Sequence, residues 1–306
     1  MADGMQRTIN TPDGRSLDVY LAGPEDGMPL LYHGGTPSSG LPYPPFVEAL
    51  AQRGLRYVSW NRPGYGSSTR RPGRSVVDVV DDARSVLQLL GADRFYTLGW
   101  SGGGPHALAC AARLGEGAIG AATIGGVAPY PAEGLDWMAG MGAENVEEFA
   151  AALAGPEALI GFKERAWPEF RAVTGEQLAA AFGDLIDDVD RASLSGEFPA
   201  WLAASMRAAL REHYWGWFDD DLAFARPWGF ALGQLRVPVH IWQGAHDRMV
   251  PFGHGEWLAA HIPTACPHLL ADQGHLTLAV DSLPQILDEL LATSRGQGGP
   301  GAASLG

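Results

Sequence analysis

The most informative stretch of this 306-residue chain is Phe95-Tyr96-Thr97-Leu98-Gly99-Trp100-Ser101-Gly102-Gly103. It begins with an apolar run typical of a strand, and an alanine-rich run typical of a helix follows at residues 105–114. At such a junction, a serine with Gly99 two residues before it and Gly103 two residues after it predicts a tight turn. This turn holds the hydroxyl clear of the backbone. The glycines permit this turn because a Cβ at either position would collide with neighbouring atoms. Ser101 is therefore a candidate nucleophile, provided that the rest of the chain supplies its partners.

Strand-like and helix-like segments alternate through most of the chain. Asp13-Gly14 is predicted as a turn between the first two strands. The strands predicted from this turn onward are residues 16–21, 29–32, 56–60, 95–100, 118–125, 237–243 and 267–271. The predicted helices between them are residues 45–53, 76–90, 105–114, 253–261 and 283–293. Repeated strand–helix units with short connections predict an α/β fold, with a mostly parallel central sheet flanked by helices.

Residues 128–229 depart from this alternation. They contain no convincing strand, and helical windows occur at residues 146–153, 175–186 and 199–213. The segment has 18 Asp and Glu against 7 Lys and Arg, and six of the ten tryptophans. We therefore expect a core formed by residues 1–127 and 230–293, with residues 128–229 inserted as a helical cap. Residues 294–306 are Gly-rich without apolar periodicity, which predicts a disordered tail.

Composition restricts the classes of partner. The net charge of −14 argues against nucleic acid or an anionic membrane as the main partner, since both require clustered Lys and Arg. The N-terminus lacks the pattern of a signal peptide, and no apolar run approaches the length of a membrane span. Cys110 and Cys266 have no metal-type spacing, so we expect buried free thiols in a reducing compartment. These features predict a cytoplasmic protein without a metal and leave its oligomeric state open.

Two polar residues follow late predicted strands. Asp247 comes after the strand at residues 237–243, and His275 comes after the strand at residues 267–271. Taken singly, Asp247 could be an ordinary loop aspartate bound to backbone amides, and His275 could be an ordinary solvated loop histidine. Because the carboxyl ends of parallel strands share one edge of a sheet, both residues are expected to converge on Ser101. Together they would form a triad of nucleophile, base and acid.

The loop His33-Gly34-Gly35-Thr36-Pro37 follows the strand at residues 29–32. We expect its Gly35 amide, or that of Thr36 as the alternative, to bind the negatively charged oxygen of a tetrahedral intermediate. Gly102, directly after the candidate nucleophile, would supply the second amide. A glycine turn without a chemical role is the competing explanation for this loop.

These motifs resemble the α/β-hydrolase fold superfamily, and more closely its capped serine hydrolases, over about residues 7–293. The order Ser101, Asp247, His275 along the chain is the order of that family. A further match is Asn61-Arg62-Pro63-Gly64-Tyr65-Gly66-Ser67-Ser68, where the family usually begins with Asp in a structural loop. The resemblance implies acyl transfer to a serine with no metal or organic cofactor. Ser101 disfavours the members with an aspartate nucleophile, such as dehalogenases and epoxide hydrolases.

The resemblance leaves the substrate open. A tryptophan-rich cap suits an apolar or ring-bearing ester, although packing against the core explains the individual tryptophans as well. An acidic cap suits a substrate amine, as in the family's proline iminopeptidases, although surface solvation explains most of these acids. Thr36-Pro37 and Trp100-Ser101-Gly102 differ from the corresponding motifs of those peptidases.

We therefore expect a carboxylesterase acting on a small to medium, partly apolar ester. A proline iminopeptidase-like aminopeptidase or amidase is the second expectation, and a non-catalytic ligand-binding protein is the alternative of another class. Thr36 and Trp100 are candidate substrate-binding residues, although Trp100 can equally pack beneath the turn. His106 is expected to be structural, and His33 is expected to shape the glycine loop.

Overall fold

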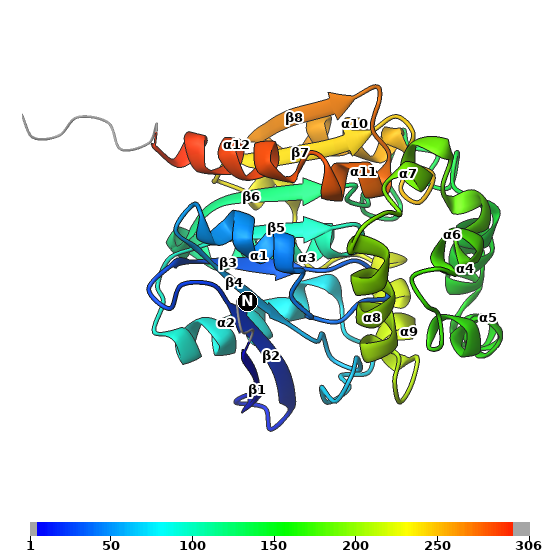
Figure 1. Cartoon of the computed structure of the whole chain (residues 1–306), viewed down its shortest axis with the longest axis horizontal. Coiled ribbons are helices and arrows are strands. Elements are labelled where there is room, and N and C mark those ends of the chain that lie inside the picture. Colours follow the sequence, from blue (N-terminus) through cyan, green and yellow to red (C-terminus); the bar gives the residue numbers. More distant parts are fainter. Residues whose placement is uncertain (1–4, 296–306) are drawn as a thin grey trace, which may run out of the picture.

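The computed structural model describes residues 5–295 and is built around one eight-stranded sheet (Figure 1). The strands are β1 (Met5–Asn10), β2 (Ser16–Ala22), β3 (Met28–His33), β4 (Leu55–Trp60), β5 (Phe95–Trp100), β6 (Ala118–Ile124), β7 (Val239–Gly244) and β8 (Ala265–Leu270). Their spatial order is β1-β2-β4-β3-β5-β6-β7-β8. The pairs β1–β2 and β2–β4 are antiparallel and the other five pairs are parallel. The predicted mostly parallel sheet is confirmed.

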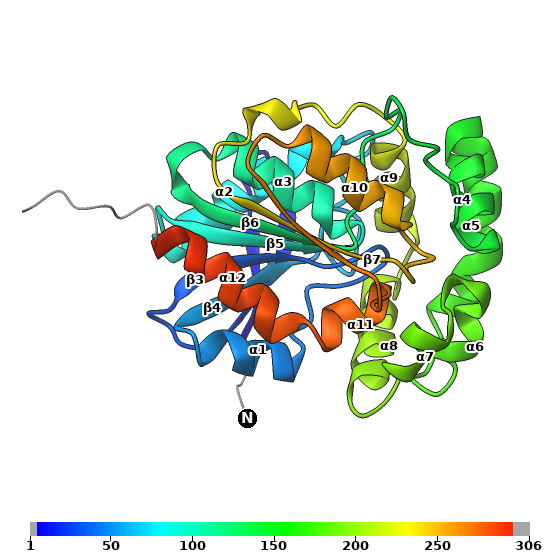
Figure 2. The ribbon, with the colours of Figure 1, turned by 90° about the horizontal axis from the view of Figure 1, so that it is seen from above.

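Helices cover both faces of this sheet. Figure 2 shows α1 (Pro44–Ala51) and α12 (Leu283–Arg295) on one face, and α2 (Val79–Leu90), α3 (Gly103–Arg113) and α10 (Phe252–His261) on the other. Adjacent residues of β3 serve the two faces, because side chains alternate along a strand. Leu30 packs in the cluster with α1 and α12, while Leu31 packs in the cluster with α2, α3 and α10. Both leucines are fully buried, as in a strand covered on both sides.

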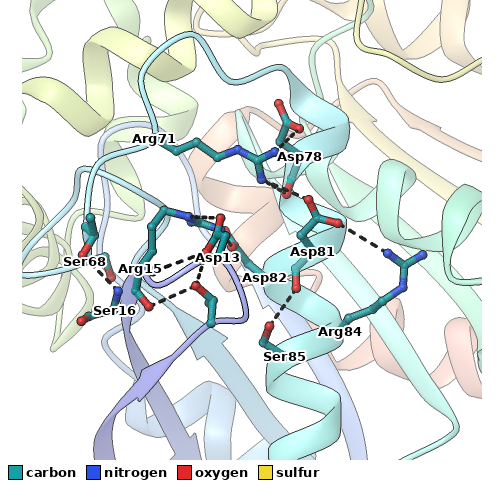
Figure 3. Close-up of polar contacts among 12 residues, drawn as sticks. Asp13, Arg15, Ser16, Ser68, Arg71, Asp78, Asp81, Asp82, Arg84 and Ser85 are labelled. Atoms are coloured by element: carbon teal, nitrogen blue, oxygen red, sulfur yellow. Dashed lines mark hydrogen bonds and ion pairs between the residues drawn. The ribbon is translucent and has the colours of Figure 1, made fainter.

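Ion pairs attach the turn between the first two strands to helix α2. The predicted Asp13-Gly14 turn joins β1 to β2, and Gly14 has a φ of 84°, which favours glycine. Arg15 pairs with Asp13 and with the buried Asp82 of α2, each at 2.7 Å (Figure 3). Arg71 pairs with Asp78 of the 3-10 turn that precedes α2 and with Asp81 of α2 itself. The antiparallel edge of the sheet is thereby anchored to α2.

Between β6 and β7 the chain forms only helices and loops, and residues 128–229, all of them described, contain no strand. The helices of this insertion are α4 (Ala143–Ala154), α5 (Pro156–Phe170), α6 (Leu178–Ala181), α7 (Asp188–Ala192), α8 (Phe198–Ala209) and α9 (Trp215–Phe224). They gather beyond the carboxyl ends of the parallel strands (Figure 1 and Figure 2). The remaining elements are α11 (His275–Val280) and the 3-10 turns η1 (Val76–Asp78), η2 (Gly115–Gly117), η3 (Gly183–Leu185) and η4 (Leu232–Gln234). No described helix is long and apolar enough to cross a membrane.

Some predicted boundaries were wrong. The helix expected at residues 175–186 is split into α6 and η3, because Gly183 adopts a φ of 49° that interrupts a helix. The long helix α5, with Pro168 inside it, was not predicted. The tail was expected to begin at residue 294, but α12 continues to Arg295, and residues 296–306 lie outside the described residues.

The two cysteines are free, but only one of them is buried. Cys110 lies inside α3 and is fully covered. Cys266 is half-buried, so the expectation that both thiols are buried was wrong for it. The reason is its place in β8, the last strand of the sheet, which has a neighbour on one side only.

Candidate active site

Ser101 lies at the predicted junction between β5 and α3. Its φ of 55° is the one positive value among the described non-glycine residues. Its amide N–H donates to the Ile124 carbonyl at 2.8 Å, which ties the strained turn to the end of β6. A Cβ at Gly99 would overlap the backbone of Gly103, and a Cβ at Gly103 would overlap the backbone of His33. Both glycines are therefore required for a turn that holds Ser101 in a strained conformation.

A buried carboxylate–imidazole pair comes from two other loops at the same edge of the sheet. Asp247 follows β7, and His275 is the first residue of α11. His275 Nδ1 lies 2.7 Å from Asp247 Oδ2. The Asp247 Oδ1 atom accepts the amide N–H groups of Met249 at 2.9 Å and Val250 at 2.7 Å, which fixes the carboxylate. Because Nδ1 faces Asp247, Nε2 is the ring nitrogen left for another partner.

The surroundings of His275 favour its protonated form. Burial opposes a charged ring, but the charge and hydrogen bond of Asp247 and the charge of Asp190 outweigh it and raise the pKa of His275. Trp100 packs against the ring with centroids 5.6 Å apart, and its Nε1 donates to the His275 carbonyl at 3.3 Å. Trp100 also lines the cavity that contains Ser101. Substrate binding by Trp100 stays a prediction.

The glycine loop after β3 lies against the serine. A Cβ on Gly35 would be 3.3 Å from Ser101 Cβ and 3.8 Å from Ser101 Oγ. A Cβ on Gly102 would be 2.5 Å from Thr36 Oγ1. The first approach puts the Gly35 backbone beside the Ser101 side chain, and the second puts Gly102, the residue after Ser101, against Thr36 of the same loop. The second approach also requires a residue without a side chain at position 102.

Arg62 holds this loop through its carbonyl groups. Its guanidinium donates to the carbonyl oxygens of Gly34 at 2.8 Å and Gly35 at 3.0 Å. The same guanidinium pairs with Asp220 at 2.7 Å. Both side chains are buried. A charged group that donates to two consecutive carbonyls restricts the orientation of the peptide units between them.

Asp220 belongs to α9 and is the common acceptor of this network. It accepts hydrogen bonds from Thr36 Oγ1 at 3.0 Å and Tyr65 Oη at 2.8 Å, and it pairs with Arg74 at 2.7 Å. Burial would raise the pKa of its carboxyl, but Arg62 and Arg74 outweigh burial and hold this pKa well below its ordinary value. The inserted helices therefore contribute directly to the position of the glycine loop.

Two buried histidines near the loop are neutral. Burial, followed by the positive charge of Arg62, lowers the pKa of His106 to about 3. Burial also lowers the pKa of His33 well below its ordinary value. His106 Nδ1 lies 2.9 Å from the Gly102 carbonyl, in keeping with the structural role expected for it. Within residues 5–295, no group of three or more His, Cys, Asp or Glu side chains is arranged to hold a metal ion.

A cavity of about 110 Å³ brings the predicted residues together. Ser101, His275, Gly35 and Gly102 line it with Trp100 and Thr36, while Asp247 lies behind His275. The rest of the lining is mainly apolar and comes largely from the insertion and nearby loops: Pro37, Val127, Met141, Phe149, Phe170, Phe182, Leu185, Leu202, Met206, Trp217, Phe224, Met249, Val250 and Leu276. Trp217 is the one lining residue among the six tryptophans at residues 128–229, all of which are described. The other five pack in or against the apolar clusters of the protein.

Three carboxylates also line the cavity. Glu148 and Asp221 both contact Lys163, the single lysine of the chain, which is fully buried. Burial and then the charge of Glu148 raise the pKa of Glu144 to about 7. Surface solvation, which explains most acids of the insertion, does not apply to five buried ones: Glu148, Asp190, Asp219, Asp220 and Asp221. Sequence reasoning missed these residues, since nothing in their local pattern distinguishes them from solvated acids.

The family model described as alpha/beta hydrolase fold matches residues 29–282. The chain belongs to the α/β hydrolase fold family. A non-heme chloroperoxidase from Streptomyces lividans is 25% identical over 249 residues, covering 80% of this chain and 83% of the relative. A bifunctional esterase/perhydrolase from Acinetobacter calcoaceticus is 25% identical over 259 residues, with coverage of 80% and 83%.

The solved structure of an esterase from Exiguobacterium antarcticum is similar to this α/β hydrolase with a TM-score of 0.65. The two chains are 20% identical, and the match covers 95% of this chain and 100% of the esterase. This likeness confirms the predicted fold. Family membership and the relatives support a hydrolase with a small-molecule substrate.

Proposed function

We propose that this α/β hydrolase is a carboxylesterase that uses Ser101 as nucleophile, His275 as base and Asp247 as acid. The observation that carries the proposal is the 2.7 Å contact between His275 Nδ1 and Asp247 Oδ2, in a ring that shares a cavity with Ser101. The strained φ of 55° at Ser101 is the expected conformation of an exposed nucleophile at a strand–helix turn. The esterase activity named for one relative supports the same chemistry.

In the acylation step, His275 Nε2 takes the proton of Ser101 Oγ as this oxygen attacks the ester carbonyl. The N–H groups of Gly35 and Gly102 bind the oxyanion of the tetrahedral intermediate. Asp247 stabilises the imidazolium and keeps Nε2 directed at the reacting atoms. The intermediate collapses when the C–O bond to the alcohol breaks and His275 returns the proton to the leaving oxygen.

In the deacylation step, a water molecule gives a proton to His275 Nε2 and attacks the acyl carbon. The second tetrahedral intermediate uses the same two amides. It collapses with cleavage of the bond between the acyl carbon and Ser101 Oγ, which recovers the proton from His275. The acid product leaves, and the free serine is regenerated.

We assign residues 1–127 and 230–293 to the catalytic core and residues 128–229 to a cap over it. The division is supported by the absence of strands in residues 128–229 and by the apolar side chains this segment contributes to the cavity. The cavity volume of about 110 Å³ is somewhat below the roughly 150 Å³ of an engineered cavity that binds benzene. A short acyl chain or a single ring therefore matches the space next to Ser101.

The ester proposal is tested with p-nitrophenyl acetate, butyrate and decanoate. We expect hydrolysis of the acetate and butyrate by the wild-type protein, weaker hydrolysis of the decanoate, and loss of activity in Ser101→Ala. Hydrolysis that persists unchanged in Ser101→Ala would refute the assignment of the nucleophile. A folded wild-type protein that hydrolyses none of a broad panel of acyl substrates would favour a non-catalytic ligand-binding protein instead.

Aminopeptidase or amidase activity is the second candidate, because Glu144, Glu148 and Asp221 all line the cavity while Lys163 supplies the one buried ammonium beside them. Burial raises the pKa values of Glu144 and Asp221, but a substrate ammonium group beside them would favour their charged forms. The direct comparison is p-nitrophenyl butyrate against prolyl-naphthylamide. Preference for the amide, lost selectively in Glu144→Gln, would reverse the ranking of the two activities.

A further inference from the structure

A buried carboxylate of the cap binds the loop that carries His275. Asp190 in α7 accepts the backbone N–H groups of three consecutive residues: His275 at 2.8 Å, Leu276 at 2.7 Å and Thr277 at 3.1 Å. Its Oδ2 atom serves the first of these groups and its Oδ1 atom serves the other two. Asp190 is fully buried. Charge-assisted hydrogen bonds of this kind are stronger than neutral ones, so the carboxylate restricts the backbone at His275.

Gly274 shows independently how close this contact is. An added Cβ at this position would overlap the Asp190 carboxylate. The φ of Gly274 is −112°, a value open to any residue, so its backbone conformation does not require glycine. The glycine before His275 is therefore needed to admit the carboxylate of the cap.

The helix that carries Asp190 is itself attached to the loop of the other triad residue. Asp187 caps α7 by accepting the N–H groups of Val189 at 2.9 Å and Asp190 at 3.3 Å. The other carboxylate oxygen of Asp187 lies 2.6 Å from Nδ1 of His246. His246 directly precedes Asp247. The short helix α7 thus connects the loops of Asp247 and His275.

We propose that Asp190 is a positioning residue of the hydrolase, which orients the His275 ring from the cap and places a second negative charge near it. The inference rests on the proposed triad. The charged groups that act on His275 are Asp247 from the loop after β7 and Asp190 from α7. Those that act on Asp190 are His275 and Asp247. The Asp187–His246 pair lies further out and is partly exposed.

Asp190→Asn tests both parts of this role. The amide keeps one accepting oxygen, but its NH₂ group must face a backbone N–H. The resulting displacement of His275 is expected to lower kcat/KM by about 10- to 100-fold. Loss of the charge lowers the pKa of His275. The acid limb of the pH profile, where activity falls because His275 becomes protonated, therefore moves to lower pH. A purely structural contact would lower activity without moving this limb.

The readout is the rate at which a fluorophosphonate labels Ser101 between pH 5 and pH 9. Asp188→Asn is the matched control, since it removes the same charge from an exposed position of the same helix. We expect slower labelling and an acid limb at lower pH in Asp190→Asn, and an unchanged profile in Asp188→Asn. Absence of labelling in folded wild-type protein would refute the triad itself. Normal wild-type labelling with identical profiles in both variants would overturn only the role of Asp190.

Gly274→Ala approaches the same contact from the other side and keeps the charge of Asp190. We expect it to slow labelling in the wild-type background, because the new methyl group displaces the carboxylate. In the Asp190→Ala background the collision is absent, so the further loss from Gly274→Ala should be small. Equal losses in both backgrounds, or no loss in Gly274→Ala alone, would contradict the proposed contact. Should the Asp190 variants fail to fold, Gly274→Ala with Asp190 intact still decides the question, because it disturbs the contact and keeps the carboxylate.

Discussion

At the scale of single residues, Asp247 is the hydrogen-bond partner of His275 Nδ1, at 2.7 Å. The charge and hydrogen bond of Asp247, together with the charge of Asp190, outweigh burial and raise the pKa of His275 above its ordinary value of 6.5. The proposed mechanism needs the neutral ring, so activity falls as the pH drops through this raised pKa. The acid limb of the wild-type kcat/KM profile is therefore expected above pH 6.5.

Asp247→Asn is expected to lower kcat by about 10⁴-fold, since the amide stabilises the wrong tautomer of the ring. The remaining activity should show an acid limb at lower pH, because the charge that favours the imidazolium is gone. The measurement is kcat/KM for p-nitrophenyl butyrate from pH 5 to pH 9. A variant that retains most of the activity, or whose acid limb coincides with that of the wild type, would show that Asp247 does not act on His275.

At the scale of elements, helix α9 is expected to hold the glycine loop in place through Asp220. Asp220→Asn weakens the pairing with Arg62, whose guanidinium holds the Gly34 and Gly35 carbonyls. Misplacing one amide donor lowers kcat by about 10²- to 10³-fold. Breaking a buried ion pair also lowers the free energy of unfolding by about 3 kcal/mol or more.

Asp219→Asn is the control for this prediction. Asp219 is also a buried carboxylate of α9, but it pairs with Arg70 at 2.8 Å and lies outside the network of the glycine loop. We expect this variant to lose stability and to keep a kcat close to that of the wild type. Both properties are measured together, by steady-state kinetics and urea unfolding. Equal losses of kcat in the two variants would contradict a specific role for Asp220.

The elements also show what the sequence could predict. The positions of Ser101, Asp247 and His275 at one edge of the sheet were predictable because each follows a strand, and the ends of parallel strands meet at one edge. Asp190 and Asp220 were not, because their partners lie far away along the chain: 85 residues separate Asp190 from His275, and 158 residues separate Asp220 from Arg62. A buried acid on a helix has the same local pattern as a solvated one, so only the fold distinguishes them.

At the scale of the whole molecule, His254 links the core to the start of the insertion. Its Nδ1 accepts the Ala128 N–H at 3.0 Å, and its Nε2 lies 2.8 Å from the Trp137 carbonyl. Burial is the main reason that the pKa of His254 is lowered to about 4. Between the ordinary value of 6.5 and this value, the unfolded chain binds a proton that the folded protein does not. His254 therefore makes stability decrease as the pH falls from 6.5 towards 4.

His254→Gln removes this titration. Between pH 7 and pH 5, the free energy of unfolding of the wild type should fall by about 2 kcal/mol more than that of the variant. The variant is less stable at pH 7 because it loses the links to Ala128 and Trp137. Urea unfolding of both proteins at the two pH values gives the difference. Parallel changes with pH in the two proteins would exclude a neutral buried His254 as the cause.

Every role proposed for the site depends on Ser101 being a nucleophile activated by His275. The most direct test of this activation is to treat the folded protein with a fluorophosphonate and to locate the adduct by peptide mass spectrometry. We predict one adduct, on the peptide that contains Ser101, which is absent from Ser101→Ala, from His275→Ala and from heat-denatured protein. Folded wild-type protein that remains unlabelled, or that carries the adduct on another residue, would show that Ser101 is not an activated nucleophile.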